Sequence, residues 1–414
     1  MKGLQSMSSI TNEKFMWCVG VEDTFIPQTR PGMRALDEYE LMDHYRLWKS
    51  DFDLAADLGV SHMRWGVPWY RVNPEPGKFD WKWIDEILEY LVVKKGIQPV
   101  IDLMHYGTPF WLENSFLNAS YPERVADYAF AFASRYKDLV RFYTPLNEPT
   151  VNAEFCGKRG EWPPYLVGND GYVKLLLPVV RGTVLSARAI READTDAVLI
   201  QVEALGKAWT KDERLTTAVK NWCEDRYLGF DLMTGCFSSH SHLFGFLQQH
   251  GVTDQDLSWF QKHAISPDVL GVNFYPISGG EFVMSDDGTP VMKIGLKAEV
   301  LGEVLQAAWE RYHLPLMVTE SGITALQMDE RKRWMDGTVA ATRQAISAGI
   351  PVLGYTWWPL FDMADWAYRL GTKPITSYIF KGGLWTCKLD KAGVMGRYRN
   401  SLANHYQEYI VGIR

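Results

Sequence analysis

The sequence predicts an α/β fold, specifically one closed (β/α)8 TIM barrel, and two observations support this. Short apolar runs rich in β-branched and aromatic residues recur along the chain, with longer stretches of helical spacing between them. Alternating strands and helices imply a mainly parallel sheet with right-handed crossovers. Eight such units over 414 residues fit a closed barrel better than an open doubly wound sheet.

The expected elements follow from this alternation. The eight strands cover Phe15–Gly20, Val60–Val67, Ile97–Met104, Arg141–Leu146, Ala197–Val202, Val269–Asn273, Leu316–Thr319 and Val352–Trp357. The helices include Asp43–Leu58, Trp83–Lys95, Pro122–Lys137, Leu175–Glu192, Leu296–Tyr312 and Asp329–Ala348. Glycines at 59, 96 and 349 stand where these helices end. We expect Phe230–Ile265 and the hairpin-like piece Ser278–Gly288 to form loops around the barrel mouth.

The organisation of the chain is expected to be simple. No linker, low-complexity tract or run of charge interrupts it, so we expect residues 1–414 to form a single barrel domain, with residues 1–12 as a poorly ordered leader. The first nine residues contain no apolar core typical of a signal peptide, and no run of 18 apolar residues occurs. We therefore expect a cytoplasmic protein.

Charge and cysteine content exclude several classes of function. The net charge is −7 and the sequence pI is about 5.8, which gives no electrostatic footprint for nucleic acid or an anionic membrane. The five cysteines are odd in number and form no Cys-x-x-Cys pair, so we expect neither a disulfide framework nor a zinc site. Nucleotide-binding glycine motifs are also missing. We expect a small-molecule partner and no metal or cofactor.

Aromatic content is high, at 14% of residues with 17 tryptophans. Such residues either fill a core or stack against the apolar faces of sugar rings in a cleft. Composition does not decide between these two interpretations.

Two expected strands end in a glutamate. The fourth runs into Asn147-Glu148-Pro149, and the seventh runs into Glu320-Ser321-Gly322. A barrel gathers its chemistry where strands end at the carboxyl face. Pro149 is expected to hold Glu148 extended, and Gly322 to allow a tight turn after Glu320. Paired carboxylates serve glycosidic cleavage, because one protonates the leaving oxygen while the other attacks or activates water.

Seven stretches in the same order resemble glycoside hydrolase family 1, the β-glucosidase family. They are Arg64–Val72, His105–Pro109, Thr144–Pro149, Leu270–Tyr275, Thr319–Gly322, Gly354–Asp362 and Gly383–Trp385. The third and fifth resemble the family signatures Thr-x-Asn-Glu-Pro and Thr-Glu-Asn-Gly, the third with one additional residue between Thr and Asn. The resemblance spans about residues 15 to 410 and implies a retaining β-glycosidase.

The resemblance implies a role for each motif residue. Glu148 is expected to be the acid/base and Glu320 the nucleophile, with carboxyl groups about 5 Å apart. Arg64 is expected to keep Glu320 ionised, and Glu148 to be harder to ionise beside a negative Glu320. Other expected contacts involve Tyr275 with Glu320, and sugar-binding groups on His105, Asn147, Asn273, Trp358 and Trp366.

Two departures from the family pattern leave the sugar open. Phe25 stands where the family carries a glutamine that binds two sugar hydroxyls, and Glu22 or Asp23 is the candidate to replace it. The Glu-Trp pair of the family stands here as Asp365-Trp366, and aspartate is one methylene shorter. Sites built for hydrogen bonds discriminate strongly when those bonds fail. We therefore expect a glycone preference not restricted to plain glucose.

A third departure concerns Trp358-Pro359, where the family usually has serine after a cis peptide bond. Because proline lowers the cost of a cis bond, we expect this bond to be cis and to orient the Trp358 ring. The serine and lysine that read phosphate in phospho-glycosidases of the family are not apparent, which disfavours a 6-phosphosugar. Alternatives to hydrolysis are a transglycosylase, a retaining glycanase of another barrel family, and a carbohydrate-binding relative with little or no turnover.

Overall fold

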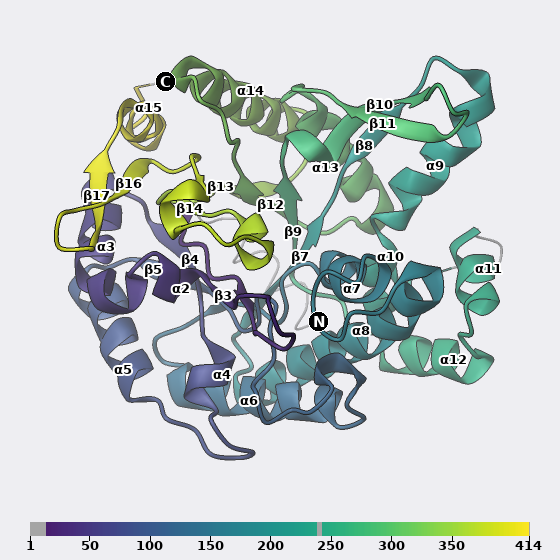
Figure 1. Cartoon of the computed structure of the whole chain (residues 1–414), viewed down its shortest axis with the longest axis horizontal. Coiled ribbons are helices and arrows are strands. Elements are labelled where there is room, and N and C mark those ends of the chain that lie inside the picture. Colours follow the sequence, from purple (N-terminus) through teal and green to yellow (C-terminus); the bar gives the residue numbers. More distant parts are fainter. Residues whose placement is uncertain (1–13, 238–241, 414) are drawn as a thin grey trace.

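A closed barrel lies at the centre of the computed structural model, which describes residues 14–237 and 242–413 (Figure 1). The expected leader, residues 1–12, lies outside this range. The barrel order is β1-β13-β12-β9-β7-β6-β5-β4, and neighbouring strands are parallel. The strands are β1 (Met16–Gly20), β4 (His62–Gly66), β5 (Gln98–Asp102), β6 (Phe142–Thr144), β7 (Val198–Ala204), β9 (Val269–Phe274), β12 (Leu316–Ser321) and β13 (Val352–Trp357). The predicted barrel and its eight strands are confirmed.

Helices surround the barrel, as Figure 1 shows. Those that match expectation are α3 (His44–Leu58), α6 (Tyr121–Tyr136), α8 (Gly168–Ala193), α13 (Val300–Tyr312) and α14 (Met328–Ser347). The helix expected over Trp83–Lys95 is divided into α5 (Lys82–Leu88) and a π-helix, η1 (Glu89–Lys94). The three predicted helix-ending glycines all have positive φ, with Gly59 at 88°. Among the described residues, no helix combines the length and apolar character needed to cross a membrane.

Two layers of core hold these elements together. A cluster made only of barrel-strand residues fills the interior of the barrel: Met16, Cys18, Val100, Phe142, Val198, Ile200, Val202, Val269 and Met317. A larger core packs the outer faces of the strands against the apolar faces of the helices, such as Val125 and Phe132 of α6. Because both faces are covered, the strands are nearly continuous runs of apolar residues. Polar residues on these strands therefore stand out at the carboxyl ends.

The expectation of a loop over Phe230–Ile265 is wrong. This part of the chain contains α10 (Leu228–Thr234), α11 (His242–Gln249) and α12 (Asp254–His263). Thr253 caps α12, because its hydroxyl accepts from the Asp256 amide and the Asp256 carboxylate accepts from the Thr253 amide. Apolar residues on these short helices, such as Phe260, then turn into the core. The helix cap and the spacing of the apolar residues together specify these helices, although the composition of the segment suggests a loop.

The hairpin-like piece Ser278–Gly288 belongs to a small sheet rather than to a loop. β10 (Gly279–Met284) pairs antiparallel with β11 (Pro290–Ile294) and parallel with β8 (Lys207–Trp209). This sheet extends away from the barrel next to α9 (Thr216–Asp225) in Figure 1.

Shorter elements complete the rim and the periphery. Two-stranded sheets join β2 (Phe25–Ile26) to β3 (Leu36–Asp37), β14 (Met363–Ala364) to β15 (Ile379–Phe380), and β16 (Trp385–Leu389) to β17 (Met395–Arg399). The remaining helices are α2 (Glu38–Leu41), α4 (Trp69–Val72), α7 (Pro149–Ala153) and α15 (Ser401–Ile410). Single turns are η2 (Ser115–Leu117), η3 (Glu154–Lys158), η4 (Glu213–Leu215), η5 (Pro276–Ser278), η6 (Trp366–Leu370) and η7 (Ile375–Ser377). Since all barrel strands are parallel, their carboxyl ends meet at one rim.

Candidate active site

Glu148 and Glu320 lie at the carboxyl rim, and both are almost fully buried, at 6% and 4% exposed. Glu320 belongs to β12, whereas Glu148 follows β6 by four residues. Asn273 at the end of β9 joins the two neighbourhoods. Its amide donates to Glu148 Oε1 at 2.8 Å, while its oxygen accepts from the Thr319 hydroxyl at 2.7 Å. The barrel thus brings together two glutamates that are 172 positions apart in the chain.

The backbone at Glu148 differs from expectation. Its φ of 46° and ψ of 66° are left-handed, so the prediction of an extended residue is wrong. Pro149 excludes the right-handed helical region for the residue before it, and proline is also favoured at the first position of a helix. Because α7 begins at Pro149 so soon after β6, the chain reverses at Glu148. Such strained conformations cluster at functional sites.

Glu320 is held by one cation and one hydroxyl. Arg64 Nη1 donates to Oε1, and the Tyr275 hydroxyl donates to Oε2 at 2.5 Å. Burial raises the pKa of Glu320 to about 8, because removal from water disfavours the charged form; the Arg64 guanidinium lowers the pKa and the nearby Glu148 carboxylate raises it. Arg64 therefore favours the ionised form of Glu320, as expected, and burial opposes it.

Arg64 organises the floor of the site. The side chain is fully buried, and Nη2 contacts both Asp102 Oδ2 and Asn147 Oδ1 at 2.7 Å. Its guanidinium also lies 5.1 Å from the centre of the Trp358 ring. One cation thus joins strands β4, β5 and β12 to the segment before Glu148, and its loss leaves two carboxylates uncompensated.

The hydrogen bonds from Arg64 to Glu148 run in one direction. Because Asn147 Oδ1 accepts from Arg64, its amide nitrogen faces Tyr106 Oη at 2.9 Å and donates there. Among the described residues, the Tyr106 hydroxyl then donates to Glu148 Oε2. A hydrogen bond donated to a carboxylate favours its ionised form. The cation beside Glu320 is thereby connected to Glu148 through two neutral side chains.

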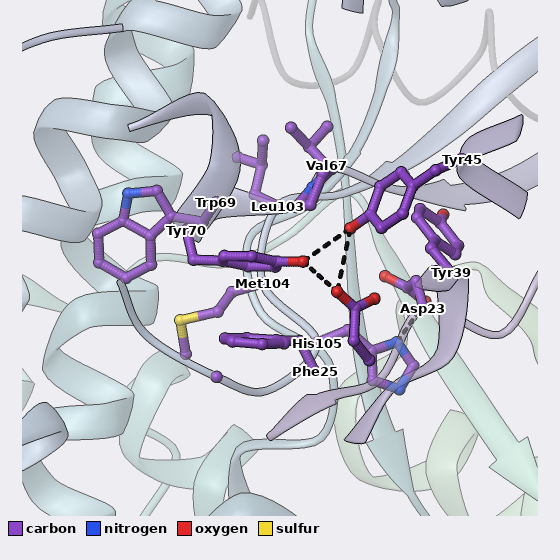
Figure 2. A pocket seen from close by; sticks show the side chains of 13 residues that line it. Asp23, Phe25, Tyr39, Tyr45, Val67, Trp69, Tyr70, Leu103, Met104 and His105 are labelled. Atoms are coloured by element: carbon purple, nitrogen blue, oxygen red, sulfur yellow. Dashed lines mark hydrogen bonds and ion pairs between the residues drawn. The ribbon is translucent and has the colours of Figure 1, made fainter. Parts of the chain in front are cut away.

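His105 is fixed in one tautomer by the same amide. Asn147 Nδ2 donates to His105 Nε2 at 2.9 Å, so the ring proton resides on Nδ1 and faces Asp23 Oδ1 at 2.8 Å. Burial raises the pKa of Asp23 to about 6, and the contact with His105 limits the rise. Figure 2 shows Asp23 and His105 side by side next to Phe25. Asp23 therefore orients His105.

Asp23, Asp102 and His105 bring three potential metal-ligating atoms within 4.8 Å of one another. Each carboxylate already faces a donor, since Asp102 contacts the Arg64 guanidinium and Asp23 contacts the imidazole. A divalent ion there would meet the positive charge of Arg64 directly. The arrangement fits an internally compensated hydrogen-bond network better than a metal centre.

Trp358 lies flat against the end of β1. The Trp358–Pro359 peptide bond is cis, as predicted. A Cβ at Gly20 would stand 2.0 Å from the ring, and one at Gly322 would stand 1.9 Å from the Trp358 carbonyl oxygen. Gly322 is therefore needed for close approach of the backbone rather than for the predicted tight turn. The indole N–H donates to Glu22 Oε2 at 2.8 Å, which ties Glu22 to the tryptophan.

The residues at the positions where the family binds the sugar hydroxyls far from the glutamates make other contacts here. Asp365 is exposed, and its carboxylate accepts from the Ala367 amide at 2.8 Å, so it caps η6. Phe25 stacks on Tyr70 with ring centres 3.8 Å apart, as Figure 2 shows. Trp366 packs edge-on against Tyr106 at 6.1 Å, and its indole N–H is buried without a partner among the described residues. Of these three residues, Trp366 is the one whose hydrogen-bond donor, the indole N–H, is not already in use. Its ring lies against Tyr106, which contacts Glu148.

Three polar residues of the site were missed from the sequence. Asp102 is the last residue of β5, and Tyr106 follows four positions later in the stretch His105–Pro109. Their position at the carboxyl end of a predicted strand could have identified both. Glu203, in β7, is buried, and Oε2 accepts from the Thr150 hydroxyl at 2.6 Å while Oε1 has no partner among the described residues. Burial raises the pKa of Glu203 to about 8. A carboxylate inside an apolar strand was the signal in that case.

Comparisons with known proteins agree with the geometry. Residues 20–192 match the sequence profile described as glycosyl hydrolase family 1. Beta-glucosidase 47 of Arabidopsis thaliana is 25% identical over 395 residues, which cover 83% of this chain and 71% of that protein. A β-galactosidase of Pyrococcus woesei is 23% identical over 416 residues, covering 79% of this chain and 80% of that protein.

Solved structures share the fold over almost the whole chain. The family 1 β-glucosidase from Thermotoga maritima in complex with isofagomine lactam has a TM-score of 0.83 at 20% identity, covering 96% of this chain and 98% of that one. The β-glucosidase from the same organism in complex with glucoimidazole has a TM-score of 0.81 at 20% identity, covering 97% and 98%.

Proposed function

The chain belongs to glycosyl hydrolase family 1, and from that premise we propose that it hydrolyses a β-O-glycoside with retention of anomeric configuration. Glu320 is the nucleophile and Glu148 the acid/base. The observation that carries this assignment is the asymmetry of their partners. A cation and a phenol face Glu320, whereas the side-chain donors that contact Glu148 among the described residues are all neutral: Asn273, Tyr106 and Asn147.

The first step breaks the glycosidic bond. The reactive form of the pair has its proton on Glu148 and its charge on Glu320, beside Arg64. Glu320 attacks the anomeric carbon while Glu148 transfers its proton to the leaving oxygen, so an alcohol departs and a glycosyl ester forms. The Tyr106 hydroxyl then stabilises the new charge on Glu148. Formation of the ester also removes the charge of Glu320.

The second step reverses the roles. Glu148, now a carboxylate, takes a proton from water as the oxygen attacks the anomeric carbon, and the ester bond to Glu320 breaks. Both residues return to their starting forms. This mechanism needs carboxyl groups about 5 Å apart, which stays a prediction for this protein.

The sugar is expected to lie against Trp358, within reach of His105 and Asn147. The Asn147 amide already donates to His105 and Tyr106. A sugar hydroxyl that binds there would replace these hydrogen bonds within the protein by hydrogen bonds to the substrate. At the far side we propose Glu22, fixed by the Trp358 indole, rather than Asp365, which caps its own helical turn. Relatives named for glucoside and galactoside hydrolysis both match this chain, and an altered far wall fits a glycone not restricted to glucose.

A panel of nitrophenyl β-glycosides tests this proposal. We expect turnover of at least one β-glycoside, with proton NMR showing the β-anomer as first product. An added alcohol acceptor measures transglycosylation, and hydrolysis is expected to dominate in water. First release of the α-anomer would contradict retention. Absence of turnover on every glycoside, together with sugar binding equal to that of Glu320→Gln, would replace the proposal with a carbohydrate-binding function.

A further inference from the structure

The residue proposed as the acid/base also stands at the start of a helix. Glu148 directly precedes α7, and its side chain makes no capping hydrogen bond to that helix. Its carboxylate instead accepts from Tyr106 and Asn273. The first amides of a helix have no partner within it, and the side chain of the preceding residue usually accepts from one of them. Because Glu148 serves the site, α7 lacks its usual cap.

A second carboxylate reaches the first turn of α7 from the neighbouring strand. Glu203, in β7, is fully buried, and its Oε2 accepts from the Thr150 hydroxyl at 2.6 Å. Burial raises the pKa of Glu203, and hydrogen bonds from the hydroxyl and the backbone of Thr150 oppose that rise, so the Thr150 amide also faces the carboxyl. Thr150 is the second residue of α7, and an N-cap side chain accepts from the amide at the second or third position.

The backbone around Glu148 is tied to the same strand. The Glu148 amide donates to the Val202 carbonyl at 3.2 Å, and Asn147 forms an isolated parallel bridge with Val202. The Asn152 amide donates to the Glu148 carbonyl at 3.0 Å, which closes the first turn of α7. β7 therefore holds the chain before the reversal through Val202 and after it through Glu203. Left-handed residues such as Glu148 persist where surrounding contacts fix them.

Helix α10 leaves room for the contact between Glu203 and Thr150, and Figure 1 shows α10 next to α7. A Cβ at Gly229 of α10 would stand 2.5 Å from Glu203 Oε1, 3.1 Å from the Thr150 methyl carbon and 3.5 Å from Pro149 Cβ. The absence of a side chain at Gly229 therefore lets β7, α7 and α10 close around the carboxyl group.

We propose that Glu203 is a positioning residue for the acid/base: it caps the first turn of α7 from β7, so that the carboxylate of Glu148 is free to face the substrate. This inference rests on the proposed hydrolysis, in which Glu148 transfers a proton in both steps. Glu203 acts through Thr150 and takes no part in the chemistry itself. A displacement of a catalytic group by about 1 Å can lower a rate by about 100-fold.

Glu203→Leu tests the cap, because leucine occupies a similar volume without a hydrogen-bond acceptor. Its effect should depend on the leaving group. We expect kcat/KM to fall by about 100-fold on an alkyl β-glycoside, whose leaving oxygen needs the proton of Glu148, and by less than about threefold on a dinitrophenyl β-glycoside. Glu203→Gln retains an acceptor for Thr150, so this conservative variant should recover most of the activity on the alkyl glycoside.

Asp268→Leu is the matched control. The Asp268 carboxylate also accepts from a backbone amide of β7, that of Leu199 at 2.8 Å, but near the start of the strand and far along it from Glu203. Any loss of kcat/KM in this variant should be equal on the two glycosides. Thr150→Val removes the hydroxyl and keeps the shape of the side chain, so it should lower the alkyl value by about tenfold and serves as the test if Glu203→Leu does not fold.

Equal losses on the two glycosides in Glu203→Leu, or a value on the alkyl glycoside as low in Glu203→Gln as in Glu203→Leu, would overturn the proposal. Hydrogen–deuterium exchange of peptides covering residues 147–158 tests the cap without turnover, and so separates its failure from failure of the proposed reaction. We expect faster exchange of this segment in Glu203→Leu than in wild type, Glu203→Gln and Asp268→Leu. Exchange at the wild-type rate in Glu203→Leu would contradict the cap even if glycosides are hydrolysed.

Discussion

Two walls of the site are built differently. The catalytic wall, our name for the proposed catalytic residues Glu148 and Glu320 together with Arg64, Asn147 and Asn273, is a connected network in which each side chain contacts at least one other member. The distal wall is our name for Glu22, Phe25 and Asp365, the residues at the positions that the family uses to bind the far hydroxyls, and no hydrogen bond joins these three within the described part of the chain. There Phe25 stacks on a tyrosine, Asp365 caps a helical turn, and Glu22 contacts the Trp358 indole.

Under the proposed function, the catalytic wall carries out the reaction and the distal wall determines the choice among sugars. Residues of the catalytic wall come from strand ends or the segments directly after them, where the barrel fixes their positions. Residues of the distal wall come from the loop after β1, from the short strand β2 and from the residue before η6, all of which lie outside the barrel strands. We therefore expect changes in the catalytic wall to affect every substrate, and changes in the distal wall to affect the choice among sugars.

Glu148→Gln is the substitution with the largest expected effect after loss of the nucleophile. Removal of the general acid should lower kcat/KM by about 10⁴-fold on an alkyl glycoside and far less on a dinitrophenyl glycoside, whose leaving group needs no proton. Steady-state kinetics on the two substrates measure the difference. An equal loss on both would assign Glu148 a positioning role only.

Glu203 is a buried carboxylate whose Oε1 has no hydrogen-bond partner among the described residues. Its pKa of about 8 lies above its ordinary value of 4.5, so the folded protein holds a proton that the unfolded chain releases. The free energy of unfolding should fall as pH rises from about 5 to 8, by up to about 1.4 kcal/mol per pH unit for this proton.

Glu203→Gln should flatten that slope. Urea unfolding at pH 5, 6.5, 8 and 9 compares the variant with wild type, and the variant should gain relative stability at the alkaline end. Asp23 and Glu320, whose pKa values are also raised, contribute the same sign in both proteins. Identical slopes would show that Glu203 does not hold a proton in the folded state.

Tyr106→Phe removes the hydroxyl group that donates a hydrogen bond to Glu148 Oε2. Loss of a hydrogen bond to the Glu148 carboxylate should lower kcat/KM by about tenfold. The groups facing Glu148 from other elements, Glu203, Tyr275 and Glu320, are unchanged in this variant. A loss of kcat/KM that only follows a loss of folded protein would indicate a packing defect instead.

Asp365→Ala should have the smallest effect. Because its carboxylate caps η6, we expect less than about a threefold change in kcat/KM and a loss of about 1 kcal/mol in stability. Glu22→Gln is the comparison, and it should alter the ranking of sugars in the glycoside panel. A large loss of activity in Asp365→Ala with no change in Glu22→Gln would reverse the assignment of the distal wall.

The strands and the polar residues at their carboxyl ends could be predicted because barrel strands are apolar and polar residues in them are conspicuous. Glu320, Arg64 and Asn273 all lie in the strands where the sequence predicts them, β12, β4 and β9. The helices α10 to α12 and the left-handed Glu148 could not be predicted from composition, because caps and a chain reversal determine them. That the Asp365 carboxylate caps η6 could not be predicted either, because motif position does not reveal which neighbour a loop side chain contacts.

The most direct test of the account is covalent trapping with a 2-fluoro-β-glycoside that carries a good leaving group. A fluorine at this position slows hydrolysis of the glycosyl ester more than its formation, so the intermediate accumulates. Peptide mapping by mass spectrometry should then locate one fluoro-sugar on Glu320, with no label in Glu320→Gln. A label on Glu148 or on any other residue would contradict the assignment of the nucleophile.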